Sequence, residues 1–574
     1  MARIRHILIE NFRGIKRFEW FPSPGINCLV GAGDSGKSTV LDAVDCCLGA
    51  RRSIPFNDAD FFEMDVSKPI TIVVTLGELD DSLKTLDSYG LFVRGFDSKH
   101  KKLEEEPDHD LETVLTVELR VTNSLEAEWS LVSERAKTQD LRRDLSWGDR
   151  AKIAPTRIGT MADHHLGWGR GSVLNRLSEE RADASTALAQ AARDVRKTFG
   201  DQAEKQLEKA LKIVEETASE LGISTGDLKA MLDVHSASLT GNTVCLHDDA
   251  GVPLRKLGIG SARLLVAGLQ RKASKESAIL IADELEHGLE PHRIIRLIDS
   301  LGAKESKPPL QVFMATHSPV VLRELSGDQI ALLKPLAGKH EVRVPGCSDE
   351  IQGTLRLYPE AFLAPSILVC EGASEVGLIR GIDQFRVVKG RQSLSALGGC
   401  LVDCGGGRPE SPFTRAAAFE ALGYRTAILR DNDKQADPKT EKQYQSAGGA
   451  VFEWRKTLCL EDELFQGLPK EAIQKLFELA IQIHGEALVD AHIRSASSGS
   501  SNGKTVEKEL AASTQLATST RKLLGLASRT KSASWFKNVR RMEFIGRHIV
   551  APSLEKSDKD FASVINKVFA WIEK

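Results

Sequence analysis

The chain has 574 residues, of which 41% are hydrophobic and 27% are charged, and its formal net charge is −3. This length predicts two or three domains, because single cores stop growing beyond roughly 250–300 residues. The composition excludes a disordered or fibrous class, and the near-neutral charge means that any nucleic-acid binding must be local. The nine cysteines lack zinc-site spacing, and no signal-peptide core or apolar run of about 20 residues is present. We therefore expect a cytoplasmic protein without a membrane partner.

A phosphate-binding loop is predicted early in the chain. Residues 26–30 favour a strand, residues 39–48 favour a helix, and residues 31–38 between them read GAGDSGKS. In this context glycines let backbone N–H groups wrap phosphates at the amino end of a helix. The alternative interpretation is a glycine turn that matches the motif by chance. Lys37 should neutralise the β- and γ-phosphates, and Ser38 should ligate Mg²⁺. The predicted ATP-binding residues of this loop are Gly31, Gly33, Asp34, Ser35, Gly36, Lys37, Ser38 and Thr39.

A helical insertion is predicted over residues 161–240. Between residues 179 and 221, apolar residues recur at intervals of three, four or seven, with charges between them. This periodicity does not separate a coiled-coil arm that pairs with a second subunit from a helical hairpin packed on its own domain. Dimerisation is the favoured role. The insertion divides an ATPase domain into residues 1–160 and 241–345.

The second half of the ATPase carries an acidic pair. Residues 278–282 form an apolar segment that ends in Asp283 and Glu284. Asp283 is expected to hold the nucleotide magnesium through water, and Glu284 to orient or deprotonate the attacking water. Residues 313–316 form another apolar segment that leads into His317. A lone histidine is more often structural than functional.

Three segments resemble ABC-type ATPases. His317 resembles their switch histidine, which senses the γ-phosphate, and residues 257–263 (LGIGSAR) resemble their signature loop. In that superfamily the signature loop completes the nucleotide site of a facing protomer. The usual Leu-Ser-Gly-Gly pattern is broken here at Gly258 and Ile259. Residues 9–14 (IENFRG) resemble the start of the heads of DNA-repair and chromosome-maintenance ATPases, which implies that membrane transport is not the function.

Residues 346–574 contain a predicted metal site. Glu371 and Glu375 follow the apolar segment 367–370 four residues apart, so both carboxylates can share one helix face. Asp431 and Asp433 follow the segment 426–429, and alternate residues after a strand point to the same side. Four carboxylates at the ends of two strands repel each other unless a hard cation lies among them. Mg²⁺ or Mn²⁺ is the expected occupant, although each pair alone is common on solvated surfaces.

This second constellation resembles the Toprim domain of topoisomerases, primases and some nucleases. Joined to an ABC-type head, it resembles the overcoming-lysogenization-defect (OLD) nucleases, over nearly the whole chain. One branch of that family is similar to the nuclease subunit of the Gabija anti-phage system, which is encoded beside a Rep-like helicase. The resemblance implies an α/β fold: an ABC-type head with a helical dimerisation insertion, followed by a Rossmann-like parallel sheet.

The same resemblance implies a catalytic lysine near the carboxyl end, and Lys537 is the residue that matches it. An ordinary surface lysine is the alternative. Residues 521–547 carry eight basic residues against one acid, with Trp535 and Phe536 among them, which is typical of a surface that tracks a phosphate backbone. A solvated basic helix would look similar. Glu461, Glu463 and Glu507 are further metal-ligand candidates that the sequence does not rank.

Together these features predict an ATP-binding, metal-dependent DNA endonuclease. Water would attack a phosphodiester at the carboxylate site, and the nucleotide state of the head would regulate access or assembly. A homo-oligomer, dimer or tetramer, is expected, with DNA as substrate, a role in anti-phage defence and a Rep-like helicase as partner. A topoisomerase or primase is a weaker alternative, because the chain has only four tyrosines and no zinc module. An alternative from a different functional class is a DNA-repair clamp or scaffold, which would not cleave DNA and whose carboxylates would be vestigial.

Overall fold

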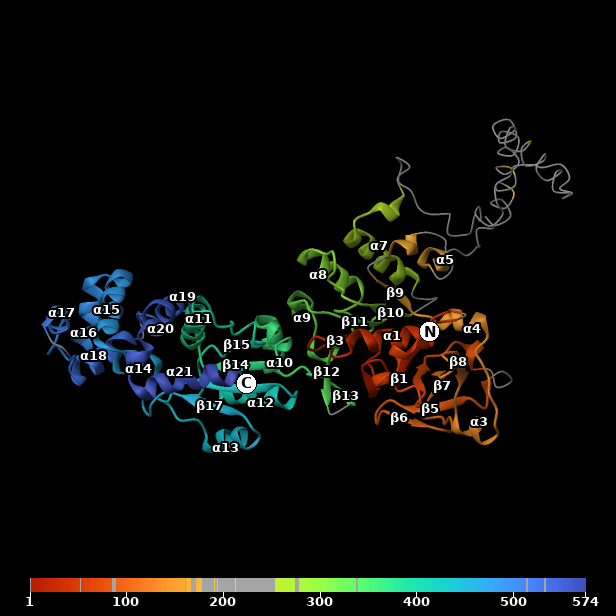
Figure 1. Cartoon of the computed structure of the whole chain (residues 1–574), viewed down its shortest axis with the longest axis horizontal. Helices are drawn as coiled ribbons and strands as arrows, with labels where there is room; N and C mark the ends of the chain where they lie inside the picture. The colour runs from red at the N-terminus through yellow and green to blue at the C-terminus, as the bar shows by residue number, and fades with distance from the viewer. Residues whose placement is uncertain are drawn as a thin grey trace. The chain divides into compact units, whose positions relative to one another are not determined.

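The computed structural model describes most of the chain outside one long interval (Figure 1). It covers residues 2–159 and 253–574 apart from residues 52, 85–88, 274–277, 337–338, 513–514 and 531–532, and from 160 to 252 it covers only residues 162–166, 172–177, 190, 194 and 212. The predicted helical insertion therefore lies almost wholly outside the described residues, and its role in dimerisation stays a prediction. Among the described helices, none has the length and apolar character that a membrane crossing requires.

The chain divides into two compact units. The first contains residues 1–29, 36–324 and 335–342, and the second contains residues 30–35, 325–334 and 343–574. The predicted α/β class is confirmed, because both units are built from sheets with helices packed on them.

The first sheet has an antiparallel and a parallel part. Its strand order is β6-β5-β7-β4-β1-β2-β13-β12-β3-β11-β10-β9, with β8 paired to β7. Strands β3, β11, β10 and β9 are mutually parallel, and β3, β10 and β11 are buried along their whole length. Continuous apolar strands are typical of parallel sheets that are covered on both faces. The strand bounds are β1 (Arg3–Phe12), β2 (Ile15–Trp20), β3 (Ile26–Val30), β4 (Ile70–Gly77), β5 (Val93–Asp97), β6 (Lys102–Glu104), β7 (Glu112–Val121), β8 (Ala127–Leu131), β9 (Thr156–Ile158), β10 (Ile279–Ala282), β11 (Gln311–Ala315), β12 (Ile330–Leu336) and β13 (Lys339–Arg343).

Two helices of the first unit position its candidate site. Helix α1 (Lys37–Leu48) packs on β1, β4, β7 and β11, and α7 (Ile259–Lys272) packs on β9. The buried Thr156 hydroxyl donates to Gln270 Oε1 at 2.9 Å and so ties α7 to the sheet. The other helices among the described residues of this unit are α3 (Glu134–Thr138), α4 (Trp147–Ile153), α5 (Val173–Leu177), α8 (Pro291–Ser300) and α9 (Pro319–Glu324).

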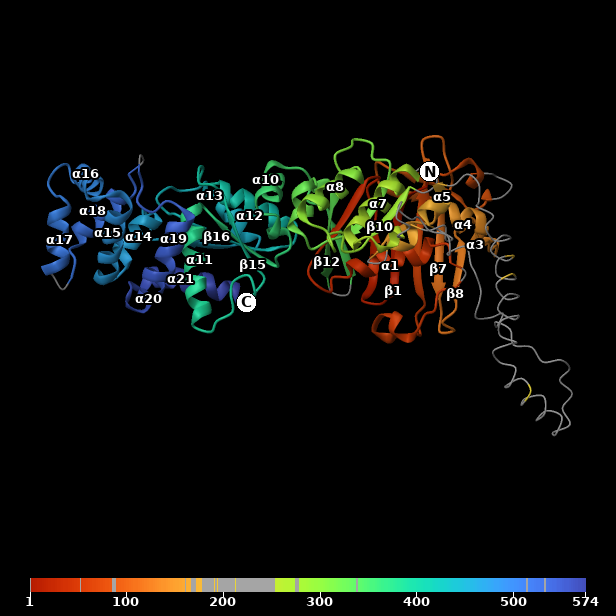
Figure 2. The ribbon, with the colours of Figure 1, turned by 90° about the horizontal axis from the view of Figure 1, so that it is seen from above.

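The second unit contains a four-stranded parallel sheet in the order β15-β14-β16-β17. Its strands are β14 (Ser366–Cys370), β15 (Gly399–Asp403), β16 (Arg425–Arg430) and β17 (Ala450–Glu453). Helix α11 (Ala373–Val388) packs on β14 and β15, and α12 (Ser411–Ala421) packs on β14 and β16. The crossover from β14 to β15 through α11 and the crossover from β15 to β16 through α12 run in opposite directions across the sheet. Because both are right-handed, the two helices cover opposite faces of the sheet (Figures 1 and 2). The strand order therefore reverses between β14 and β16, and ligands of such sheets bind at the carboxyl ends of the strands beside that point.

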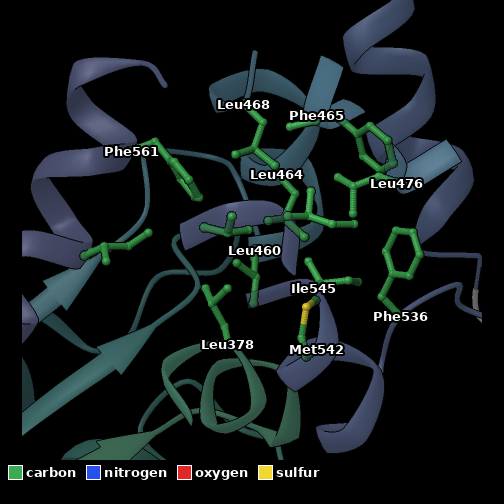
Figure 3. Close-up of a cluster of buried hydrophobic side chains, with 14 of the residues drawn as sticks. Leu378, Leu460, Leu464, Phe465, Leu468, Leu476, Phe536, Met542, Ile545 and Phe561 are labelled. Carbon is green, nitrogen blue, oxygen red and sulfur yellow. The ribbon is translucent and has the colours of Figure 1, made fainter. Parts of the chain in front are cut away.

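Helices complete the second unit around an apolar core (Figure 3). Leu460, Leu464 and Phe465 of α14 (Leu460–Gly467) point into this core, which fixes the rotation of that helix. Phe536 also lies in the core, next to Trp535, and both side chains are fully buried. The prediction that these two rings belong to a DNA-contacting surface is therefore wrong. The remaining helices of this unit are α10 (Asp349–Leu357), α13 (Pro438–Ser446), α15 (Lys470–His484), α16 (Glu486–Ala496), α17 (Gly503–Ala512), α18 (Thr518–Ser528), α19 (Val539–Ile545), α20 (Ala551–Ser553) and α21 (Lys559–Ile572).

Candidate nucleotide and metal sites

The loop between β3 and α1 has the backbone that phosphate binding requires. Gly36, the residue before α1, has φ 89°, and Asp34 has φ 58°. A Cβ on Gly31 would lie 2.7 Å from Ser35 Oγ and 2.8 Å from the Leu333 carbonyl oxygen, so this position needs glycine. The first turn of α1 has no acidic residue that would oppose an anion at its amino end. The local geometry therefore fits the predicted role of the loop.

The other predicted residues of this site lie in the phosphate loop, at the start of α1 and after two parallel strands. Lys37 is 6% exposed, Ser38 is exposed and Thr39 is half-buried at the start of α1. Nothing lies within 4 Å of a Cβ placed on Gly33, so space alone does not require glycine there. Asp283 and Glu284 follow β10, and His317 follows β11, its parallel neighbour in the sheet.

Arg263, the last residue of the LGIGSAR segment, holds the loop that carries the acidic pair, a role that the sequence reasoning did not assign to it. Its side chain lies on α7, is 1% exposed and donates to the carbonyl oxygens of Glu284 at 2.8 Å, His287 at 3.1 Å and Gly159 at 3.1 Å. Glu284 has φ 46°, an unfavourable conformation for a residue with a Cβ. The buried guanidinium thus fixes a strained turn next to the predicted catalytic carboxylate.

Glu286 is a second residue that the sequence reasoning missed. Its carboxylate accepts hydrogen bonds from the Thr316 hydroxyl at 2.7 Å and from the His317 backbone N–H at 2.8 Å. The loop after β10 is thereby joined to the residues after β11, where His317 lies. No local sequence pattern indicates either contact, because the partners of Arg263 and Glu286 come from other elements of the sheet.

We expect Arg263→Met to impair ATP turnover more than ATP binding. Methionine fills a similar volume but leaves buried carbonyl groups without donors, at roughly 1–3 kcal/mol for each group. The strained turn at Glu284 should then relax, so kcat for ATP hydrolysis should fall at least about tenfold while KM changes little. Steady-state ATPase kinetics measure both values. Arg296→Met, at an exposed position on α8, is the control, and equal kcat values in the two variants would contradict this role for Arg263.

In the second unit, two predicted carboxylates lie at the ends of adjacent parallel strands. Glu371 follows β14, and its Oε2 accepts a hydrogen bond from the Asp431 backbone N–H at 2.9 Å. Asp431 follows β16, and its Oδ1 accepts from the Leu460 backbone N–H at 2.8 Å. Glu375 lies in the first turn of α11, is 3% exposed and accepts from the Gly372 backbone N–H at 2.9 Å. Asp433 is exposed.

The expected shared helix face for Glu371 and Glu375 is wrong in detail. Helix α11 begins at Ala373, so Glu371 lies in the loop between β14 and the helix. The two carboxylates are brought together by this loop and by the backbone contact from Asp431, which arises from the neighbouring strand β16. Tertiary pairing, not helix periodicity, builds the cluster.

Glu461 joins this group of acids from α14. Its carboxylate and one oxygen of Asp431 lie within 4.8 Å of each other and of the Cys459 sulfur. By contrast, Glu463 is held by Arg455, with Oε2 2.8 Å from Nη2, and Glu507 is exposed on α17. Among the three acids that the sequence did not rank, the geometry therefore favours Glu461 as the additional metal ligand.

Burial and mutual repulsion raise the pKa values of Glu371, Glu375 and Asp431. Desolvation, followed by the charges of Asp431, Glu461 and Glu371, raises the pKa of Glu375 well above its ordinary value. Desolvation, followed by Glu371 and Glu461, does the same for the pKa of Asp431. Removal from water also raises the pKa of Glu371. Hard oxygen donors that repel one another in this way fit Mg²⁺ or Mn²⁺, which would relieve the repulsion.

These shifts predict that the metal-free protein loses stability as the pH rises. The folded chain keeps protons that the unfolded chain releases near its ordinary carboxyl pKa of about 4, so the free energy of unfolding falls from about pH 4 upwards until the raised pKa values are passed. In EDTA at pH 7.5, Asp431→Asn should raise the melting temperature by roughly 2–4 °C, the shift that about 1 kcal/mol gives a domain of this size. Calorimetry at pH 7.5 and pH 5 measures the effect. If the increase in melting temperature is not smaller at pH 5 than at pH 7.5, carboxylate repulsion is not its cause.

The predicted catalytic lysine has no described contact with this cluster. Lys537 is exposed, between the buried Phe536 and the start of α19. A cation that does lie near the acids is Arg529, whose Nη1 is 3.0 Å from Asp462 Oδ2 and which interacts electrostatically with Asp433. Lys537 therefore stays a prediction, without contacts that support it.

Part of this chain is similar to known proteins. A family model described as "AAA domain, putative AbiEii toxin, Type IV TA system" matches residues 26–323. A 53-residue stretch, 9% of the chain, is 47% identical to the DNA replication and repair protein RecF of Nitrosococcus oceani and spans only 14% of that protein.

Among solved structures, the SMC head bound to the C-winged helix domain of ScpA is 15% identical, with a TM-score of 0.34 over 59% of this chain and 96% of that one. The SMC head domain from Thermotoga maritima is 13% identical, with a TM-score of 0.28 over 60% of this chain and 98% of that one.

Proposed function

The chain belongs to the AAA-domain family whose model matches residues 26–323, and on this premise we propose that it is an ATP-binding, divalent-metal-dependent DNA endonuclease. The predicted ATPase in the first unit is confirmed by that match. The nuclease site, the Toprim assignment and the membership of the OLD family are the proposed part, and they concern the second unit.

The carboxylate cluster of the second unit carries the proposal. Glu371, Asp431 and the buried Glu375 and Glu461 gather where the strand order reverses at β14, the usual ligand position of such a sheet. A structural role alone does not account for this arrangement, since like charges at such short range destabilise the fold. Acids that cost stability without a cation are typical of sites kept for chemistry.

The chemistry that fits this cluster is hydrolysis of a phosphodiester. A divalent ion held by Glu371, Glu375, Asp431 and Glu461 would polarise the phosphate and lower the pKa of water bound beside it. The chain itself orients the ligands, because backbone N–H groups of Asp431, Gly372 and Leu460 fix the carboxylates of Glu371, Glu375 and Asp431. Exposed Asp433 would face the substrate side of the site.

We assign ATP a regulatory role, in which nucleotide binding controls the association of the ATPase domains of two copies of the chain. At the loop that resembles the ABC signature, Leu257 is 42% exposed and Ile259 is 46% exposed. Exposed apolar side chains at the start of α7 suit a contact with a second copy of the chain. A homo-oligomer, dimer or tetramer, whose assembly depends on nucleotide is therefore part of the proposal.

DNA is the proposed substrate, with anti-phage defence as the biological role and a Rep-like helicase as partner. These assignments follow from the resemblance to OLD nucleases. The basic segment 521–547 supports DNA contact less than its sequence suggested, because Arg521 donates to the Leu468 carbonyl oxygen at 2.7 Å and Arg529 pairs with Asp462. Lys522, Lys537, Arg540 and Arg547 remain exposed for phosphate contacts.

A plasmid-nicking assay tests the proposal directly. Supercoiled DNA is incubated with the full chain in Mg²⁺, in Mn²⁺ and in EDTA, each with and without ATP. Cleavage that requires the metal is the expected result, and the ATP arms show whether nucleotide activates or inhibits it. DNA binding without cleavage under every condition would overturn the nuclease proposal and favour a DNA-repair clamp. The short similarity to RecF makes that function the main alternative.

A further inference from the structure

A thiol lies within the carboxylate cluster. Cys459 precedes α14 as its N-cap residue and is 5% exposed. Its sulfur, one oxygen of Asp431 and one oxygen of Glu461 all lie within 4.8 Å of one another. Mg²⁺ takes oxygen ligands, so a cluster built for Mg²⁺ alone has no use for sulfur at this position.

Glu461 supplies an independent indication of a cation at the same point. Its side chain is 5% exposed, yet among the described residues its carboxylate accepts no hydrogen bond and forms no ion pair. The carboxylate lies within 4.8 Å of an Asp431 oxygen and of the Cys459 sulfur, and carboxylates at this range repel each other unless a cation lies between them. A positive ion between the three donors would remove that repulsion.

Arg529 and Asp462 lie beside the thiol. Its Nη1 lies 3.8 Å from Cys459 Sγ and 3.0 Å from Asp462 Oδ2, which is itself 3.3 Å from the sulfur. Burial, followed by the charges of Glu461 and Asp462, raises the pKa of the Cys459 thiol, so a metal ion that binds there must displace the thiol proton. Asp462 can accept the hydrogen bond of the thiol while the proton is still present.

We propose that Cys459, Asp431 and Glu461 form a site for Zn²⁺ that inhibits the proposed nuclease. Zinc–sulfur bonds of about 2.3 Å and zinc–oxygen bonds of about 2.0–2.2 Å place tetrahedral ligand atoms about 3.3–3.7 Å apart, so modest side-chain rotations close the present cluster. The thiol proton passes to solvent on binding, and the fourth position is left for water. Asp431 and Glu461 belong to both ligand sets, so zinc there displaces the ion that the nuclease needs.

This inference rests on the proposed function only for the inhibition, not for the binding. Zinc binds nitrogen and sulfur donors more tightly than Mg²⁺ or Mn²⁺ does. Low concentrations of Zn²⁺ should therefore act against an excess of Mn²⁺. The chemistry assigns the site a regulatory role, in which the availability of zinc determines whether the carboxylates can cleave DNA.

Cobalt titration of the full chain tests the binding without any activity measurement. Co²⁺ replaces Zn²⁺ and gives a near-ultraviolet thiolate-to-cobalt charge-transfer band when sulfur is a ligand. We expect this band in the parent, its loss in Cys459→Ser and in Cys459→Ala, and its retention in Cys347→Ser, which removes an exposed cysteine of the same unit. Serine is a good N-cap residue, so Cys459→Ser should keep α14 folded.

The inhibition is measured as the Zn²⁺ concentration that halves the Mn²⁺-supported nicking rate of each variant. It should rise at least about tenfold in Cys459→Ser. If the parent nicks DNA but gives no charge-transfer band, Cys459 is not a ligand and the inference is overturned while the nuclease stands. If the band appears in a chain that never nicks DNA, the zinc site stands and the proposed nuclease fails.

Discussion

Asp431→Asn is expected to abolish metal-dependent nicking while leaving DNA binding intact. The amide oxygen of the substituted side chain can still accept the hydrogen bond from the Leu460 backbone N–H, so the local fold is retained. The loss of one charged ligand at the centre of the cluster removes several kcal/mol of metal-dependent charge stabilisation. Because each 1.4 kcal/mol is a factor of about ten, the nicking rate should fall by at least about 10³-fold.

Nicking assays on control variants and DNA-binding measurements distinguish a loss of catalysis from misfolding. Asp437→Asn makes the same chemical change at an exposed residue six positions further along the chain, and it should nick plasmid like the parent. Glu371→Gln should repeat the loss seen in Asp431→Asn, since Glu371 accepts from the Asp431 backbone in the same cluster. Gel-shift affinity for DNA should stay within about threefold of the parent in all three variants. Parental nicking rates in Mn²⁺ for both cluster variants would end the nuclease proposal.

Lys37→Ala is expected to weaken ATP binding. Charge-assisted hydrogen bonds to phosphate are worth roughly 1.5–3 kcal/mol, so the affinity for ATP should fall about 10- to 100-fold. Glu284→Gln should behave differently, because glutamine keeps the shape of the side chain and loses only its charge. That variant should bind ATP like the parent and hydrolyse it at least about 10²-fold more slowly. Equilibrium dialysis and phosphate release give the two quantities.

The matched control for the lysine is Lys68→Ala, which removes an exposed side chain that pairs with Asp65. It should change neither ATP affinity nor turnover. Parental affinity in Lys37→Ala would disprove the assignment of the phosphate loop. Parental turnover in Glu284→Gln would leave the loop intact and show that another group activates water.

The sequence predicted best those structural features that depend on the residues of one short segment. The loop GAGDSGKS, an apolar strand before it and a helix after it are local, and the left-handed backbone at Gly36 follows from the residue type. Period-two and continuous apolar patterns likewise located β14 and β16, and the acids after them could be expected at one edge of a parallel sheet.

The sequence did not predict contacts between distant elements. Arg263 holds the turn at Glu284 from α7, and Glu286 joins that turn to His317. Glu461 enters the carboxylate cluster from α14, whose rotation is fixed by Leu460 and Leu464 in the core. A glutamate in such a helix looks like any solvated acid until the packing of the opposite face is known.

By itself, then, the sequence determined the nucleotide loop, the α/β class and the two acidic strand ends, because backbone geometry and apolar periodicity are local properties. Only the tertiary structure decided which other groups meet them. It placed Glu461 and Cys459 beside Asp431, and it buried Trp535 and Phe536. The physical reason is that side-chain burial and charge proximity depend on which elements pack together, and packing minimises exposed apolar area over the whole unit, a quantity that no short window of sequence contains.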